Sequence, residues 1–219
     1  MKSTDTALAA LAGYVDTLSF VALFGLFTAH VTGNFVLIGA ALTGHGKGVF
    51  LKLIVFPAFI AGVALCSLIV RAHPSHGARL LYAAQALLML GFCAAGVLAT
   101  PIQQTDSGWA LVAGILGTFA MGIQNAHSRV IQRPHVPSTV MTGNVTQAVL
   151  DAMDALSPTV GAQDRKSAKT RLSKMIPAII GFACGAAAGA FAYEWVGFWA
   201  LLAPTAALTW LACQKQEDL

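Results

Sequence analysis

The chain has 219 residues, of which 57% are hydrophobic and only 10% are charged, and its formal net charge at pH 7 is +4. So few charged side chains cannot cover a water-facing surface, and uncharged apolar stretches of about 20 residues recur along the chain. The composition therefore excludes a soluble globular protein and a basic nucleic-acid-binding domain. It predicts an all-α polytopic protein embedded in the lipid bilayer.

Six stretches are long enough to cross the hydrocarbon core, which takes about 20 apolar residues. In chain order they cover residues 7–27, 53–70, 80–100, 108–127, 175–193 and 195–213. Two shorter apolar segments remain, Thr32 to Thr43 and Thr142 to about Ala155. A helix of about 12 residues is only about 18 Å long, against about 30 Å of hydrocarbon. We therefore expect two re-entrant or broken helices beside six transmembrane helices.

The basic residues distinguish two topologies. If the two short segments do not cross, all 13 Lys and Arg residues except Lys47 and Lys52 fall on one side of the membrane. If they cross, giving eight spans, Lys47 and Lys52 join that side and four arginines move to the other, namely Arg71, Arg79, Arg129 and Arg133. The positive-inside rule favours the first arrangement, with six spans and both termini in the cytoplasm.

The short segments also mark an internal repeat. Each begins with Thr-Gly-Asn, at Thr32–Asn34 and at Thr142–Asn144, and the words "AGYVD" and "MGIQN" end 18 and 19 residues before the respective asparagines. After each short segment comes a span that opens with a proline word, "FPAFIAGVAL" or "IPAIIGFACG". The halves 1–104 and 105–219 thus each read as span, short helix, span, span. Because three crossings are odd, the second half is expected to be inverted relative to the first.

Helix starts inside a membrane have a physical use. They direct backbone N–H groups and a partial positive charge into the protein interior. The starts share three residue types: N-capping threonines, glycines that allow close approach, and asparagines that offer donors and acceptors. These residues are Thr32, Gly33, Asn34, Thr142, Gly143 and Asn144. Two such starts, related by a two-fold axis in the membrane plane, would meet near its midplane and form one substrate site.

Charged residues inside the apolar segments extend this candidate site. Asp16 lies well within the first predicted span, so it faces either a cavity or a partner, unless it is a buried ion pair or a protonated carboxyl. Its repeat mate is Asn125, and Arg129 follows one helical turn later on the same face. Arg129 either reaches an anion or Asp16, or flanks the membrane as a cytoplasmic arginine.

Two histidines lie beside these residues. His30 precedes the first Thr-Gly-Asn and His127 falls between Asn125 and Arg129, so both are candidates that titrate near neutrality, or else interfacial loop residues. His73 and His76 form H-x-x-H without a nearby carboxylate or cysteine, so we expect no metal there. The cysteines stand singly in apolar segments and predict no cofactor.

The paired motifs resemble those of a known family. Gly13 to Asp16 with Thr32 to Asn34, and Gly122 to Ala126 with Thr142 to Asn144, are similar to the YoaK-like family of bacterial inner-membrane proteins, which has no assigned function. The resemblance covers essentially the whole chain. It implies a multi-pass protein of the bacterial inner (plasma) membrane and no particular substrate.

Two classes of function fit these observations. The first is a transporter or channel for a small polar solute or ion, anions included, which binds at the two helix starts. The second is a membrane-embedded enzyme or a structural partner subunit, in which Asp16, His30 and His127 are catalytic or structural. Inverted repeats with broken helices favour transport over catalysis. Gly181, Gly185 and Gly189 predict close packing with a helix of the same chain or of a second copy, so a homo-oligomer stays open.

Overall fold

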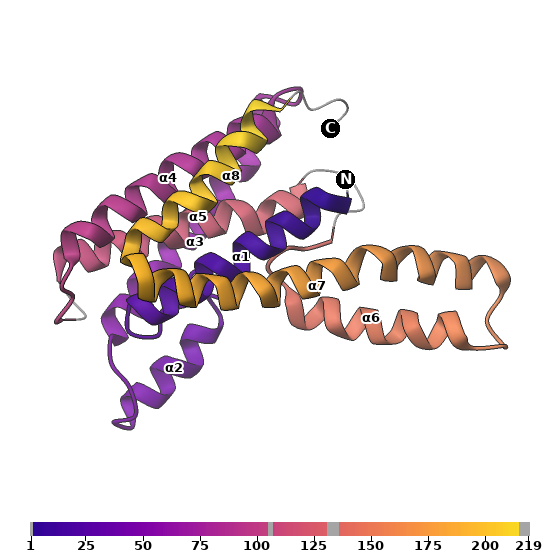
Figure 1. Ribbon diagram of the computed structural model, residues 1–219, viewed down its shortest axis with the longest axis horizontal. Coiled ribbons are helices and arrows are strands. Elements are labelled where there is room, and N and C mark those ends of the chain that lie inside the picture. The colour runs from indigo at the N-terminus through magenta and orange to yellow at the C-terminus, as the bar shows by residue number, and fades with distance from the viewer. Residues whose placement is uncertain (1, 105–106, 131–135, 215–219) are drawn as a thin grey trace.

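The computed structural model describes residues 2–104, 107–130 and 136–214, which form helices and no strand (Figure 1). The helices are α1 (Lys2–Ala22), α2 (Gly33–Leu42), α3 (Val49–Ala72), α4 (Gly77–Ala99), α5 (Gly108–Val130), α6 (Met141–Leu156), α7 (Ala162–Val196), the 3-10 helix η1 (Gly197–Leu201) and α8 (Leu202–Cys213). Four segments are long and apolar enough to cross a membrane, namely α3, α4, α5 and the stretch Ala162–Cys213. The all-α membrane class is confirmed.

Several helix bounds differ from the sequence prediction. The first helix ends at Ala22 rather than at residue 27, because Phe24 and Gly25 adopt positive φ angles of 54° and 76°, which an α-helix cannot continue. The last predicted span, residues 195–213, is divided among the end of α7, η1 and α8. Residues 162–174, which precede the predicted span 175–193, are the start of α7, which is 35 residues long. They are rich in Ala, Lys and Arg, which are strong helix formers, and α6 packs along them.

The most extensive helix–helix contact joins α1 to α7, which run in the same direction. Gly185 lies against the backbone carbonyl of Ala10, and one helical turn later Gly189 lies against the carbonyl of Tyr14. A side chain at either glycine would collide with the facing backbone. The predicted close packing of this glycine stripe is therefore made within the chain, through small residues that let two helices approach.

A second parallel pair, α3 and α5, packs in the same manner. Gly114 faces Leu51 near the start of both helices, and further along Gly122 lies against the backbone carbonyl of Phe59. Gly122 and Gly13 occupy corresponding places in the two repeat words, and Gly13 lies against the carbonyl of Phe182 on α7. The corresponding helices of the two halves thus make corresponding contacts.

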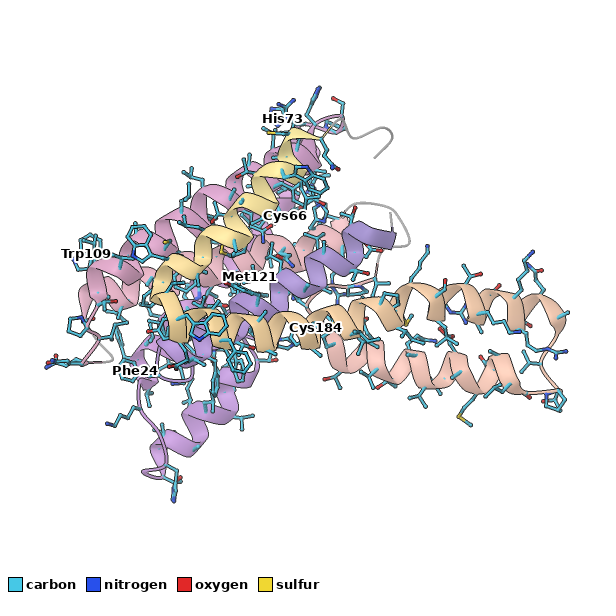
Figure 2. The ribbon with its side chains drawn as sticks, viewed as in Figure 1. Phe24, Cys66, His73, Trp109, Met121 and Cys184 are labelled. Carbon is cyan, nitrogen blue, oxygen red and sulfur yellow. The ribbon has the colours of Figure 1, made fainter. Side chains whose placement is uncertain are left out.

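The fourth helix runs antiparallel to α5 and to α8. Gln85 near its start donates to Gln124 near the end of α5 over 2.6 Å. Gly96 near its end faces the ring of Phe198 in η1, directly before α8 begins and returns along α4. Gly197, with φ of 59°, turns the chain from α7 into η1. Figure 2 shows His73 at the end of the bundle opposite to Phe24 and Trp109.

Two helices extend away from the bundle as hairpins (Figure 1). Among the described elements, α2 packs on α3 and α6 packs on α7, and neither packs on a third element. The buried Lys52 at the start of α3 donates from Nζ to the Phe24 carbonyl at 2.8 Å. The chain that leaves α1 at Ala22 thus returns to the same end of the bundle after α2. In the other half, α6 accompanies the charged first half of α7.

Candidate functional site

A cavity of about 510 Å³ lies between the two Thr-Gly-Asn helix starts. It brings together the segment before α2, one face of α3, the end of α5 and the start of α6. Its lining consists of Ala29, His30, Val31, Thr32, Phe56, Phe59, Asn125, Arg129, Thr139, Val140, Met141 and Thr142. Five of the predicted site residues therefore face one space, and none of the lining residues is acidic.

The carboxylate of Asp16 lies buried directly behind this cavity. Its Oδ1 accepts the backbone N–H groups of Thr28 at 2.8 Å and Ala29 at 2.7 Å, and its Oδ2 lies 2.7 Å from Nδ1 of His30. An ionised carboxylate only accepts, so Nδ1 of His30 is the donor in this contact. Asp16 thus orients a histidine that lines the cavity.

Two further residues, which the sequence analysis did not select, fix this segment to α1. Ser19 Oγ donates to the Asp16 carbonyl at 2.9 Å and lies 3.0 Å from the hydroxyl of Thr28, and both side chains are buried. In the other half, Ser128 Oγ lies 3.5 Å from the Asn125 carbonyl. The sequence does carry a signal for these serines: each repeat word ends in Asp or Asn, and a serine follows three residues later.

The segment before α6 is held to α5 in a similar way. Asn125 Nδ2 donates to Thr139 Oγ1 at 2.7 Å, and the buried Gln124 donates to Ser138 Oγ at 3.2 Å. Thr28 to Asn34 reads "TAHVTGN" and Ser138 to Asn144 reads "STVMTGN", so the similarity between the two segments extends beyond the three residues Thr-Gly-Asn. Each half therefore supplies one anchored loop to the cavity.

The two motif asparagines brace these loops from behind. Asn34 is buried and makes two bonds to Phe27, accepting from its N–H at 3.0 Å and donating to its carbonyl at 2.8 Å. Asn144 is also buried and donates to the Pro137 carbonyl at 2.7 Å. Neither asparagine lines the cavity, because both amides are used inside the loops that they close.

The helix starts differ from the predicted capping geometry. Thr32 is the N-cap of α2 but its side chain makes no cap bond, and the N–H of Gly33 donates to the His30 carbonyl at 2.8 Å. The cap of α6 is Val140, so Thr142 lies inside the helix and its predicted capping role is wrong. In α2 the N–H of Asn34 likewise donates to the Val31 carbonyl, whereas in α6 the N–H of Asn144 makes the first regular helical bond, to the N-cap Val140. Gly33 and Gly143 lie beside the cavity rather than on its lining.

Comparison with known proteins gives the family. A family model described as a protein of unknown function, DUF1275, matches residues 6–214. The chain belongs to the DUF1275 family. It is 30% identical over 150 residues to the UPF0700 transmembrane protein YoaK of Bacillus subtilis (strain 168), an alignment that spans 64% of this chain and 62% of YoaK. No solved structure matches. The predicted YoaK-like membership is confirmed, and the apolar helices agree with a transmembrane relative.

Arg129 and His127 lie on different sides of α5 in this DUF1275 fold. Arg129 is exposed in the cavity and makes no ion pair with any residue in the described part of the chain, so Asp16 is not its partner. His127 is buried on the other side of α5, where its ring centroid lies 5.1 Å from that of Tyr82. It does not line the cavity, because it stands two residues from each of the cavity residues Asn125 and Arg129 on the helix.

Proposed function

We propose that this protein is a membrane transporter or channel for a small anion, which binds in the cavity between the two helix starts. One observation carries the proposal: the lining includes the guanidinium of Arg129 and the imidazole of His30 but no carboxylate. An arginine that makes no ion pair within the described residues is suited to bind a carboxylate or an inorganic oxyanion through paired hydrogen bonds. A volume of about 510 Å³ lies in the range of small-molecule sites.

The polar lining supports a small rather than a lipid-like substrate. Thr32, Thr139 and Thr142 bring hydroxyls from both halves, and Asn125 contributes an amide that already donates to Thr139. Hydroxyls of this kind can donate to an oxyanion held by Arg129. Aromatic rings of α3 close the apolar side of the cavity.

The membrane arrangement that we propose has six crossings in two inverted repeats. The parallel pairs α1 with α7 and α3 with α5 support this repeat, because each pair joins equivalent helices of opposite halves. The antiparallel course of α4 and α8 favours six crossings over eight. In six crossings they are the third and the sixth and run oppositely, whereas in eight they would be the fourth and the eighth and run alike. In this arrangement α2 is re-entrant, both termini are cytoplasmic, and α6 follows the charged half of α7 out of the bilayer.

Alternating access follows from the two parallel pairs. The loop before α2 is fixed to α1 by Asp16, whereas α3 and α5 supply the opposite wall. A hydrogen bond from Gln124 to the Leu8 carbonyl, 2.7 Å long, joins α5 to α1. Rocking of one pair against the other would open the cavity to either side while each anchored loop moves with its own helix.

Uptake by the purified chain in liposomes tests the function. We expect uptake of small carboxylates or inorganic oxyanions and none of matched neutral solutes. Arg129→Gln should raise the KM for the anion about 10- to 100-fold, the loss expected for one charged hydrogen-bonding partner. Arg129→Lys keeps the positive charge and should retain part of the affinity for the anion.

Arg79→Gln is the matched control, because Arg79 is exposed on α4 and does not line the cavity. It should leave uptake unchanged. If no anion enters and Arg129→Gln changes nothing, transport through this cavity is wrong, and turnover of a membrane substrate or recovery of a bound subunit would support the second class of function.

A further inference from the structure

A second groove, of about 480 Å³, runs along the first half of α7, outside the cavity described above. Three basic side chains line it, Lys166, Arg171 and Lys174, and none of its lining residues is acidic. Its lining also includes the apolar side chains of Val136, Pro137 and Met175. The groove is therefore amphipathic, with basic side chains along α7 from Lys166 to Lys174 and apolar lining beside them.

The positive charge is available to a ligand. Arg171 is paired with Asp151 of α6 at 2.6 Å, so its charge is largely compensated. The ammonium groups of Lys166 and Lys174 make no hydrogen bond or ion pair with residues in the described part of the chain, and Lys166 is bonded there only through its backbone. Figure 2 shows long side chains tipped with nitrogen on this part of α7, where it extends beyond the bundle. The two lysines thus give the groove its net charge.

The groove also lies at a defined height relative to the apolar part of α7. From Met175 onward α7 carries no charged residue before Glu194, and it belongs to a segment apolar enough to span a membrane. Lys174 immediately precedes that apolar part, and Lys166 lies about 12 Å further out along the helix. The headgroup layer of a bilayer is about 5 to 7 Å thick on each side of the hydrocarbon. The basic side chains therefore reach from headgroup depth into water.

We propose that this groove binds the phosphate headgroup of an anionic phospholipid, with the beginning of an acyl chain on Pro137 and Met175. Lysine side chains attract phosphate, and the hydroxyls of Ser167 and Thr170, which also line the groove, can donate to its oxygens. Basic pockets next to a membrane span have the charge and the depth for such headgroups. The apolar lining at Met175 favours a lipid over a soluble phosphate.

Native mass spectrometry of the full chain in detergent, with phosphatidylglycerol and phosphatidylcholine at equal concentration, tests the site. We expect the wild type to retain phosphatidylglycerol preferentially. The double variant Lys166→Gln/Lys174→Gln should bind it about 30-fold more weakly, the change expected for two lost basic contacts. Lys169→Gln, an exposed lysine of the same helix outside the groove, should change binding less than about twofold.

Further arms separate the alternatives. Lys166→Arg/Lys174→Arg keeps the charge and should keep the lipid, which separates lost binding from lost folding. Equal weakening by Lys169→Gln would indicate diffuse attraction of the whole hairpin and would overturn the proposal. Inorganic phosphate alone should neither displace the lipid nor raise the melting temperature, and if it did both, the groove would be a site for free phosphate.

Discussion

The Nδ1 atom of His30 lies 2.7 Å from Oδ2 of Asp16, although Asp16 is inside α1 and His30 belongs to the loop that follows it. The same carboxylate accepts two backbone N–H groups of that loop. One side chain therefore does two things: it fixes the loop to α1 and it orients the imidazole of His30. In our proposal that imidazole lines the anion site.

Substitution Asp16→Asn separates these two roles. Its Oδ1 can still accept from the N–H groups of Thr28 and Ala29, but its amide would donate to Nδ1 of His30 and so place the ring proton on Nε2. We expect the protein to fold with a stability loss of about 1 to 2 kcal/mol, and the KM for the anion to rise because a carboxylate no longer orients the imidazole. Detergent melting and liposome uptake measure both effects.

The control for this experiment is His30→Gln, which removes the imidazole and leaves the carboxylate in place. It should raise the KM for the anion in the same way and cost less stability, because the loop N–H groups keep their acceptor. An Asp16→Asn protein with wild-type stability and a wild-type KM would remove Asp16 from the proposed site.

The two motif asparagines give a matched pair for the loops. Asn34 makes two hydrogen bonds with Phe27, whereas Asn144 faces Pro137, which has no N–H to donate. We therefore expect Asn34→Ala to lower the melting temperature more than Asn144→Ala, with a difference in unfolding free energy of about 1 kcal/mol. Equal losses, measured by denaturation in the same detergent, would contradict this view of the loops.

The coarse architecture was predictable because membrane constraints act on composition. Hydrocarbon thickness sets the length of an apolar helix, so each long helix from α3 to α8 overlaps a predicted span. The paired Thr-Gly-Asn words are readable because they interrupt apolar stretches, and the inverted repeat that they predict stays a prediction. The helical start of α7 at residues 162–174 is not evident from the sequence, because a charged stretch beside a span also fits a loop, whereas in the fold α6 packs there and Arg171 pairs with Asp151.

The finer geometry of the site depends on contacts that span the fold. Nothing local indicates that Asp16 receives backbone N–H groups rather than the Arg129 guanidinium, since that choice is made by the turn at Phe24 and Gly25. The first-turn N–H groups of α2 are likewise satisfied by loop carbonyls whose position only the folded chain defines. The side of α5 that Arg129 faces was predictable from its spacing with Asn125, and both line the cavity.

Helix packing makes a prediction at the glycines. A Cβ at Gly185 would overlap the Ala10 backbone, which cannot move without separating α1 from α7. Gly185→Ala should therefore lower the yield of folded protein in detergent, with a destabilisation of about 1 to 3 kcal/mol. Gly39→Ala is the control, because a Cβ at Gly39 on α2 meets no atom within 4 Å. That change should be neutral or stabilising, and equal harm from both would show that the α1 and α7 contact is looser than described.

The hairpin of α6 and α7 makes a prediction about pH. Asp151 accepts from Arg171 at 2.6 Å and from Gln147 at 3.1 Å, and the bond from Arg171 is the main reason that the pKa of Asp151 is lowered from its usual value. A carboxylate with a lowered pKa in the folded state stabilises the fold above its unfolded pKa of about 4. That contribution is lost as the pH falls through the lower, folded value.

Amide hydrogen exchange in α6 reports this pair, since α6 packs on no described element other than α7. Arg171→Met should speed exchange about two- to fivefold relative to the wild type at pH 5 to 7, where the carboxylate is ionised, as expected for an ion pair whose arginine is exposed. The ratio should approach one below about pH 3, because Asp151 is then protonated in both proteins. Asp151→Asn should show lowered protection factors that depend little on pH. A ratio for Arg171→Met that stays constant down to pH 3 would mean that the guanidinium acts by packing rather than by its charge.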